Sequence, residues 1–175
     1  MNELNSKKIR LRLIDVKDAD FVLGLRLNSK YNQFLSVVKP DLEAQKKWII
    51  EYKIEELAGR QFYFIIERTD GTPCGTVRIY DIRNDSFCWG SWILNENKTR
   101  CAAIESAFLV YDFGFNELGF NKAHFDVVKL NERVVSFHKK MGAVEVDEDE
   151  INFYFEITRE SVEAAKKKLI FRIAS

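Results

Sequence analysis

The chain has 175 residues, 46% of them apolar, which suits one ordinary globular domain with a sizeable core. Lysine and arginine total 27, and aspartate and glutamate also total 27, so no net charge favours a nucleic-acid partner. No apolar run approaches the roughly 20 residues of a membrane span, and the N-terminus lacks the apolar stretch of a signal peptide. We therefore expect one cytoplasmic domain over residues 1–175, with neither nucleic acid nor membrane as a partner.

The first half of the chain predicts alternating strands and helices. Residues 7–14 alternate apolar and basic side chains, which is typical of a half-exposed strand. Residues 15–20 supply one helix start, and Pro40-Asp41 caps a second helix, because a short acidic side chain can accept from the first free backbone amides. The first helix should end near residue 28 and the second near residue 57. Three strands are then expected over residues 61–68, 74–82 and 87–94.

The second half predicts a helix over residues 104–118, a strand over 123–128 and a helix from Asn131 to Gly142. A hairpin over residues 143–146 and 151–157 follows, and Thr158 caps a last helix near 160–169. The three cysteines form no Cys-x-x-Cys pair or Cys/His cluster. We expect Cys74, Cys88 and Cys101 to be free buried thiols, and we expect no metal site.

The most informative segment lies between the strand that ends at Leu94 and the helix that follows. The loop Lys98-Thr-Arg-Cys-Ala-Ala103 contains small side chains directly before that helix. Small residues let the backbone approach a ligand, and the first-turn N–H groups of a helix point toward a bound anion. This segment therefore predicts a pyrophosphate-binding loop.

The order of elements around this loop resembles the GNAT superfamily of acyl-CoA-dependent N-acetyltransferases. Members carry [Gln/Arg]-x-x-Gly-x-[Gly/Ala] after their fourth strand, and Lys98, Cys101 and Ala103 occupy these three places. Cys101 fits the first glycine place provided that its φ is negative. Downstream, the helix from Asn131 to Gly142 matches a second family motif, with His138 at the place of the usual tyrosine.

The resemblance implies a single α/β domain with a mixed, mostly antiparallel sheet that is splayed between its fourth and fifth expected strands, and with helices on both faces. It implies acetyl-CoA as co-substrate and a small-molecule amine as acceptor, and it is compatible with a homodimer. His138 would protonate or hydrogen-bond the departing CoA sulfur, since histidine is a stronger acid at neutral pH than tyrosine. The backbone of the fourth strand would stabilise the oxyanion, the loop would hold the pyrophosphate and Asn131 would contact the pantetheine arm. The implied cofactor-binding residues are Trp92, Ile93, Leu94, Lys98, Thr99, Arg100, Cys101, Ala102, Ala103 and Asn131.

The acceptor is suggested by the N-terminal half, which is similar to a branch of ribosomal-protein and nucleotide-linked amino-sugar acetyltransferases. Within that branch, the chain looks more like enzymes of surface-polysaccharide synthesis. Arg26, Asn28 and Trp48 are the candidate acceptor-binding residues. Two alternatives stay open: a protein N-terminal or polyamine acetyltransferase, and a non-catalytic domain that binds acyl-CoA. No residue is marked as the general base, and His124 and Asp126, on one strand face, are interpreted as a structural pair.

Overall fold

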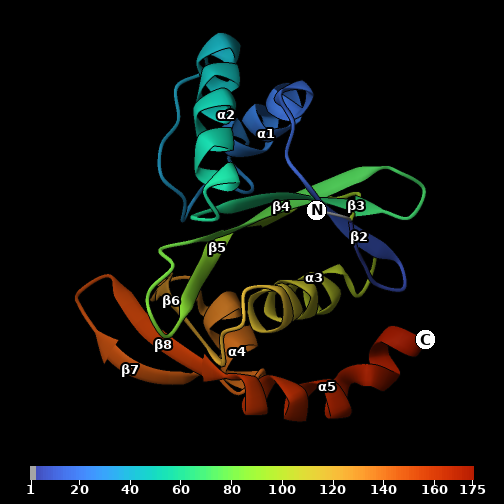
Figure 1. Cartoon of the computed structure of the whole chain (residues 1–175), viewed down its shortest axis with the longest axis vertical. Helices are drawn as coiled ribbons and strands as arrows, with labels where there is room; N and C mark the ends of the chain where they lie inside the picture. Colours follow the sequence, from blue (N-terminus) through green and yellow to red (C-terminus); the bar gives the residue numbers. More distant parts are fainter. Residues whose placement is uncertain (1–2) are drawn as a thin grey trace.

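One eight-stranded sheet organises the protein, in the strand order β1-β2-β3-β4-β5-β6-β8-β7 (Figure 1). The computed structural model describes residues 3–175. The strands are β1 (Leu4–Asn5), β2 (Ile9–Leu13), β3 (Phe62–Arg68), β4 (Pro73–Tyr80), β5 (Phe87–Leu94), β6 (Lys122–Val128), β7 (Val144–Glu148) and β8 (Asn152–Thr158). The helices are α1 (Ala19–Leu27), α2 (Leu42–Leu57), α3 (Ala102–Asp112), α4 (Glu132–Lys140) and α5 (Arg159–Ala174).

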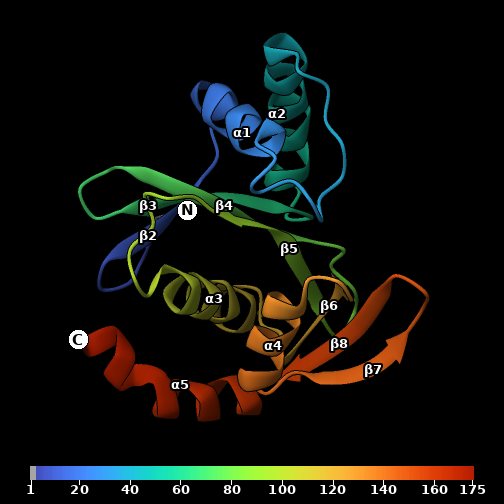
Figure 2. The ribbon, with the colours of Figure 1, turned by 180° about the vertical axis from the view of Figure 1, so that it is seen from behind.

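The sheet separates two hydrophobic cores, because successive side chains of a strand point to opposite faces. On β3, Phe62, Phe64 and Ile66 face the core that is built around α3, whereas Tyr63 and Ile65 face α1 and α2. Both views of the ribbon place α1 and α2 on one face and α3, α4 and α5 on the other (Figures 1 and 2). Residues 62–66 of β3 are all apolar, as expected of a strand that is covered by side chains on both faces.

The predicted helix starts are confirmed. Asp15 caps a short 3₁₀ turn (Val16–Asp18) before α1, and Asp41 and Thr158 cap α2 and α5 through their side-chain oxygens. The ends of two helices differ most from the sequence interpretation. A π-helical turn (Phe113–Glu117) replaces the end of the helix expected up to residue 118, and α5 continues to Ala174. No helix within residues 3–175 is long and apolar enough to cross a membrane.

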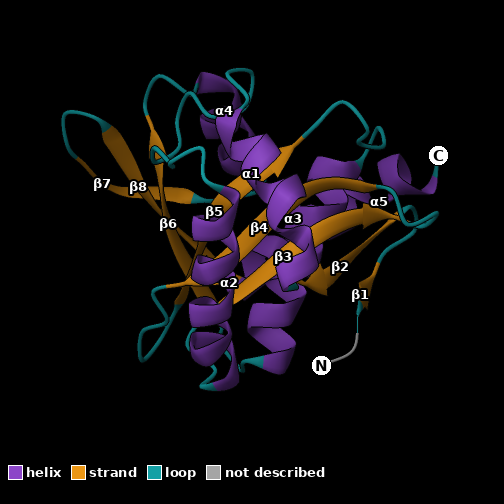
Figure 3. Cartoon of the chain, turned by 90° about the horizontal axis from the view of Figure 1, so that it is seen from above, coloured by secondary structure: helices purple, strands orange, loops and turns teal. Residues whose placement is uncertain are grey.

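The predicted splay lies between β5 and β6, which are the fourth and fifth expected strands because the short β1 was not expected. These parallel strands pair only at Phe87↔Ala123 and Cys88↔His124. Beyond Cys88 they separate, and β6, β8 and β7 fan away from the rest of the sheet when the molecule is seen from above (Figure 3). The mixed, mostly antiparallel α/β fold with helices on both faces is thus confirmed.

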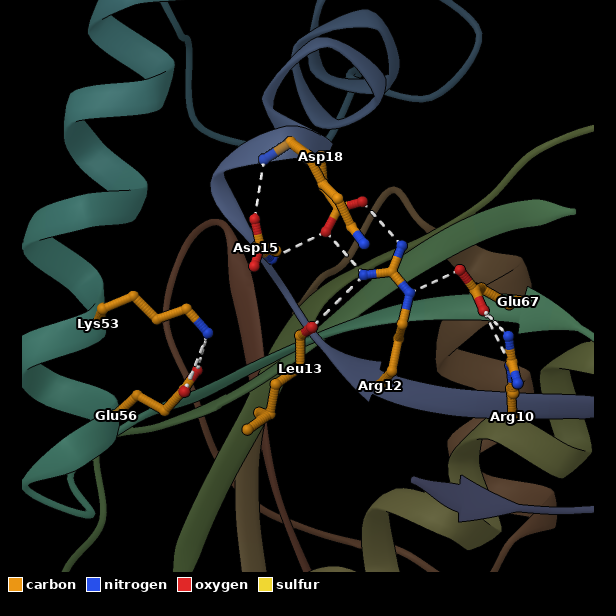
Figure 4. Close-up of polar contacts among 9 residues, drawn as sticks. Arg10, Arg12, Leu13, Asp15, Asp18, Lys53, Glu56 and Glu67 are labelled. Atoms are coloured by element: carbon orange, nitrogen blue, oxygen red, sulfur yellow. Dashed lines mark hydrogen bonds and ion pairs between the residues drawn. The ribbon is translucent and has the colours of Figure 1, made fainter. Parts of the chain in front are cut away.

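A network of ion pairs fixes the start of α1 to the sheet (Figure 4). Arg12 on β2 binds both carboxylate oxygens of Asp18 at 2.7 Å and one oxygen of Glu67 at 2.6 Å. Glu67 is buried on β3 and also accepts from Arg10, 2.9 Å away. Burial would raise the pKa of Asp18, but hydrogen bonds from Arg12 and from the Asp15 amide outweigh it and lower that pKa.

Candidate active site

The end of β5 leaves the regular sheet through a β-bulge. Thr76 pairs with Ile93 and Arg78 with Gly90, so Ser91 and Trp92 together oppose the single residue Val77. Ser91 takes a positive φ of 48°, which is uncommon outside glycine. The neighbouring strands approach so closely here that a Cβ on Gly75 would collide with the carbonyl oxygen of Ile93. The bulge thus lies in the part of β5 that pairs with β4 on one edge but no longer pairs with β6 on the other.

A cleft of about 410 Å³ opens where β5 and β6 separate. Asp126 is the single carboxylate that lines it among the described residues 3–175. Asn131 and His138 line it from α4 and its start, and Arg26 lines it from α1. The other lining residues are Tyr31, Phe34, Leu35, Ser36, Tyr80, Trp89, Gly90, Ser91, Trp92, Phe125, Val127, Val128 and Val134. The splay therefore creates a cleft lined by both aromatic and polar side chains, as expected of a ligand site.

His138 lies in this cleft among aromatic rings. Its ring centroid is 4.2 Å from that of Phe125 and 5.4 Å from that of Trp89, and its Nδ1 is buried without a hydrogen-bond partner. Burial lowers the pKa of His138 to about 3. The expectation that His138 is an imidazolium acid at neutral pH is therefore wrong. The neutral ring can still donate one N–H hydrogen bond and accept another.

The loop from Lys98 to Ala103 has backbone donors available for an anion. Cys101, at the start of α3, has a φ of −103°, so a cysteine is accommodated at this glycine place without strain. Its thiol donates to the carbonyl of Arg172 at 3.1 Å and does not cap the helix. The amides of Ala103 and Ile104 meet no acceptor within residues 3–175, and the Thr99 hydroxyl is buried without a partner. These unpaired groups fit a pyrophosphate.

The remaining residues expected to bind acetyl-CoA lie on β5, at the start of α4 and in the loop that leads into α3. Trp92 lines the cleft, and its Nε1 donates to Ser106 at 3.2 Å. Ile93 and Leu94 continue β5 toward the loop and pair with Thr76 and Gly75. Asn131 lies at the N-terminus of α4 without making a capping hydrogen bond, so its amide is available to a ligand. Lys98 and Arg100 are exposed, Ala102 is buried, and Cys101 is only partly buried, contrary to the expectation of a buried thiol.

A second cavity of about 400 Å³ lies beside the cleft, beneath the loop that joins α1 to α2. Ser91, Arg26 and Ser36 line both spaces, so the two adjoin at the bulge. Trp48 and Arg78 line the second cavity, and the Arg78 guanidinium lies 5.4 Å from the centroid of the Trp48 ring. Arg26 and Trp48 thus meet in one cavity, as candidate acceptor residues should.

Asn28, the third candidate acceptor residue, lies elsewhere. Its side-chain oxygen accepts from the amide of Lys30 at 2.9 Å, which stabilises the turn after α1. Asn28 lines neither cavity. Arg26 in turn donates to the carbonyl and the hydroxyl of Ser36, at 3.0 and 2.7 Å, so it also holds the loop over the second cavity.

The interpretation of His124 and Asp126 as a structural pair needs a correction. His124 is satisfied by other partners, since its Nδ1 lies 2.7 Å from the Ser86 hydroxyl and its Nε2 lies 3.0 Å from Asp81. Asp126 is exposed and faces the cleft. The pKa of Tyr80 is raised mainly by burial and further by Cys88 and Asp126. The carboxylate of Asp126 therefore acts electrostatically on Tyr80 in the wall of the cleft.

Comparisons with known proteins were consistent with this geometry. Residues 8–144 match the family described as acetyltransferase (GNAT) domain. An apo structure of FdhC, described as a nucleotide-linked sugar GNAT, is 45% identical to the chain, with a TM-score of 0.89 and 97% of each chain covered. The chain belongs to the GNAT acetyltransferase family. The predicted family is thereby confirmed, and no match was found among the curated proteins.

More distant GNAT structures agree in fold alone. The ribosomal-protein-S5-alanine acetyltransferase from Vibrio fischeri has a TM-score of 0.78 at 14% identity, over 91% of this chain and 98% of its own. The N152L mutant of spermidine N-acetyltransferase SpeG from Vibrio cholerae has a TM-score of 0.72 at 18% identity, over 88% and 95%. Since acceptors as different as a protein and a polyamine are named for these neighbours, the GNAT fold does not define the acceptor.

Two residues of this GNAT site were missed by the sequence analysis. Arg78 interrupts the apolar run Val77-Arg-Ile79, and a lone arginine in a central strand is a signal that the side chain meets something other than core. Asp126 was assigned to His124 because both lie on one strand face. The better partner of His124, Asp81, comes from a turn that sequence spacing does not connect to β6.

Proposed function

We propose that this protein transfers an acetyl group from acetyl-CoA to a primary amine of a nucleotide-linked amino sugar. The observation that carries the proposal is the junction of two spaces at Ser91, with a cleft suited to an acyl thioester on one side and a basic cavity on the other. The similarity to FdhC, a nucleotide-linked sugar GNAT, supports the same acceptor class.

The acetyl-CoA side uses groups that have no hydrogen-bond partner among the described residues. The free amides of Ala103 and Ile104 and the Thr99 hydroxyl would hold the pyrophosphate of CoA, and Asn131 would bind its pantetheine arm. Acetyl-CoA supplies the activated acyl group as a thioester. The backbone of β5 near Trp92 has no partner strand beyond Cys88, so its outward amides would stabilise the oxyanion.

Acceptance of the amine proton and stabilisation of the leaving group are assigned to two groups of the cleft. An amine attacks only after its ammonium form has lost a proton, and Asp126 is the carboxylate placed to accept it, directly or through water. His138, buried and neutral, would donate an N–H hydrogen bond to the departing sulfur. Asp126 on β6 would thus act on the attacking amine, and His138 on α4 would act on the leaving group.

The charge of the acceptor cavity argues against a polyamine. Arg26, Lys39 and Arg78 line it, with Asp41 as the single carboxylate among the described lining residues. A polycation such as spermidine would be repelled there, whereas a diphosphate would be attracted. A protein N-terminus and a purely acyl-CoA-binding function are left as outcomes of the test.

The test offers acetyl-CoA with nucleotide-linked amino sugars, N-terminal peptides, spermidine and simple amines, and follows the release of free thiol. We expect the nucleotide-linked amino sugars to be turned over preferentially. Preferential acetylation of peptides or spermidine would overturn the acceptor. Acetyl-CoA binding without turnover of any amine would favour the non-catalytic alternative.

Acetyl-CoA binding can be tested separately by thermal unfolding. A hundredfold excess of ligand over its dissociation constant should stabilise the protein by about 2.7 kcal/mol. Ala103→Asp should abolish this stabilisation, because the carboxylate blocks the approach of the pyrophosphate and repels it. Ala164→Asp, on the exposed side of α5, is the matched control and should keep it. Loss of the shift in both variants, or in neither, would contradict the assignment of the loop.

A further inference from the structure

Arg26 and Arg78 lie in the same cavity, and each has a donor that no group of the described residues 3–175 accepts from. The Nε atoms of both side chains are buried without a hydrogen-bond partner. Neither guanidinium forms an ion pair with a carboxylate of the described residues, whereas Arg10, Arg12, Arg60, Arg68 and Arg83 do. The other described arginines without an ion pair, Arg100, Arg133, Arg159 and Arg172, have no buried unpaired nitrogen. Buried unpaired donors are rare in native proteins, so this pair requires an explanation.

The surroundings orient both side chains without neutralising them. Arg78 donates its Nη2 to the side-chain oxygen of Gln61, and its guanidinium lies 5.1 Å from the Tyr80 ring centroid. Arg26 donates to Ser36. All of these partners are uncharged, so the contacts fix the direction of each guanidinium and leave its charge in place.

The electrostatic cost of this arrangement is visible at Arg78. Burial lowers its pKa, and the charge of Arg26 lowers it further, although the neighbouring tyrosines act in the opposite direction. Asp41, the one carboxylate among the described residues that line the cavity, accepts from the Ala44 amide at the start of α2. Two like charges held in one partly buried cavity are favourable when a dianion binds between them.

We propose that Arg26 and Arg78 together form the binding site for the diphosphate of the acceptor, separate from the pyrophosphate loop at Lys98–Ala103. The inference rests on the proposed function, since it identifies the group by which the nucleotide-linked acceptor is held. It assigns a specificity function to Arg78: an amine without a phosphate group would be a poor substrate.

CoA also contains a pyrophosphate, so the experiment must distinguish the two sources. Isothermal titration of the full chain without acetyl-CoA would use the diphosphates of uridine, thymidine, guanosine and cytidine, the phosphate-free nucleosides and, separately, CoA. We expect at least one nucleoside diphosphate to bind and its nucleoside to bind more weakly. Arg78→Gln and Arg26→Gln should each weaken the diphosphate about 10- to 100-fold, as expected for a lost charged hydrogen bond, with CoA affinity unchanged.

Matched variants separate the local contact from general effects. Arg60→Gln removes an exposed, ion-paired arginine and should leave diphosphate binding unchanged. Ser36→Ala removes one loop contact of Arg26 but keeps its charge, so it should weaken the diphosphate less than Arg26→Gln does. Arg78→Lys keeps the charge without the planar donor pair and should give an intermediate affinity, which also guards against misfolding of the glutamine variant.

Equal diphosphate affinity in the wild type and Arg78→Gln would overturn the site, as would a failure of all four nucleoside diphosphates to bind. Loss of CoA affinity in Arg78→Gln with unchanged diphosphate affinity would also overturn it, because the pair would then belong to the donor. The proposed function fails by a different result: no nucleotide-linked amino sugar releases thiol from acetyl-CoA, even if diphosphates bind.

Discussion

Two pairs of arginines in one domain differ in what surrounds them. Arg10 and Arg12 on β2 reach Glu67 and Asp18, so all four side chains are neutralised by ion pairs (Figure 4). Arg26 and Arg78 contact only uncharged partners and keep unpaired donors in a cavity. The difference separates a network that stabilises the fold from one that is incomplete without a ligand.

The same contrast extends to the rest of the cleft. The unpartnered buried atoms include Nδ1 of His138 and the hydroxyl of Thr99, and both lie where acetyl-CoA is proposed to bind. Unpaired polar groups reduce stability, so they persist where function requires them. Substitutions in the β2–β3 network should therefore affect folding, and substitutions in the cleft should affect catalysis or binding.

The largest effect is expected at Asp126, on the catalytic side of the contrast. Asp126→Asn should lower kcat about 10²- to 10⁴-fold, because the amide cannot accept the proton of the attacking amine. Stability should barely change, since Asp126 is exposed. Steady-state kinetics and urea unfolding measure the two quantities. Glu150→Gln, in the exposed turn before β8, is the control, and an unchanged kcat for Asp126→Asn would remove it from the mechanism.

Substitution of Glu67 tests whether the ion-pair network of β2 and β3 stabilises the fold. Glu67→Gln leaves two arginines without their buried counterion and should lower the free energy of unfolding by about 3 kcal/mol. Glu3→Gln removes only the exposed partner of Arg10 and should cost less than about 1 kcal/mol. Denaturant unfolding compares them, and activity per folded molecule should be retained. Equal losses in the two variants would show that burial of Glu67 does not matter.

His138 should make stability depend on pH. Its pKa is about 3 in the folded protein and near 6.5 in the unfolded chain, so between these values only the unfolded chain binds the proton. Stability should therefore fall by about 1.4 kcal/mol per pH unit as the pH drops below 6.5. His138→Phe should lack this dependence of stability on pH. Above pH 7, the stability of the wild type and of His138→Phe should change with pH by nearly the same amount. Parallel stability curves down to pH 5 would contradict a buried neutral His138.

The fold was predictable from local signals because these coincide with the global arrangement. Asp15, Asp41 and Thr158 start helices by a mechanism that depends only on neighbouring residues. The π-helical turn after α3 was not predictable, since the helical spacing of apolar residues continues through Phe113 and Phe115. There the packing of Phe87 against Gly114 and Phe115 shapes the backbone, and that contact is distant in sequence.

The sequence allows a proposal for the donor side of the candidate site more readily than for the acceptor side. The loop before α3 is one continuous segment, so a motif could identify Lys98–Ala103. The acceptor cavity combines Arg26 from α1, Trp48 from α2 and Arg78 from β4, which no spacing connects. The protonation state of His138 was mispredicted for a related reason, because the rings that exclude water from it come from β5, β6 and β8.

The smallest effect, and the most direct test of the contrast, concerns the stability of the protein without ligand. Arg78→Met removes a partly buried charge together with its contacts to Gln61, Trp48 and Tyr80. These changes oppose one another, so the free energy of unfolding should change by no more than about 1 kcal/mol.

Arg12→Met makes the matched change in the paired network. It leaves Asp18 and Glu67 without their shared cation and should cost several times more. Urea unfolding of both variants in ligand-free buffer measures the difference. A nucleoside diphosphate should then stabilise the wild type and Arg12→Met, but not Arg78→Met. If Arg78→Met were as costly as Arg12→Met, Arg78 would be structural, and the two arginine pairs would no longer differ in kind.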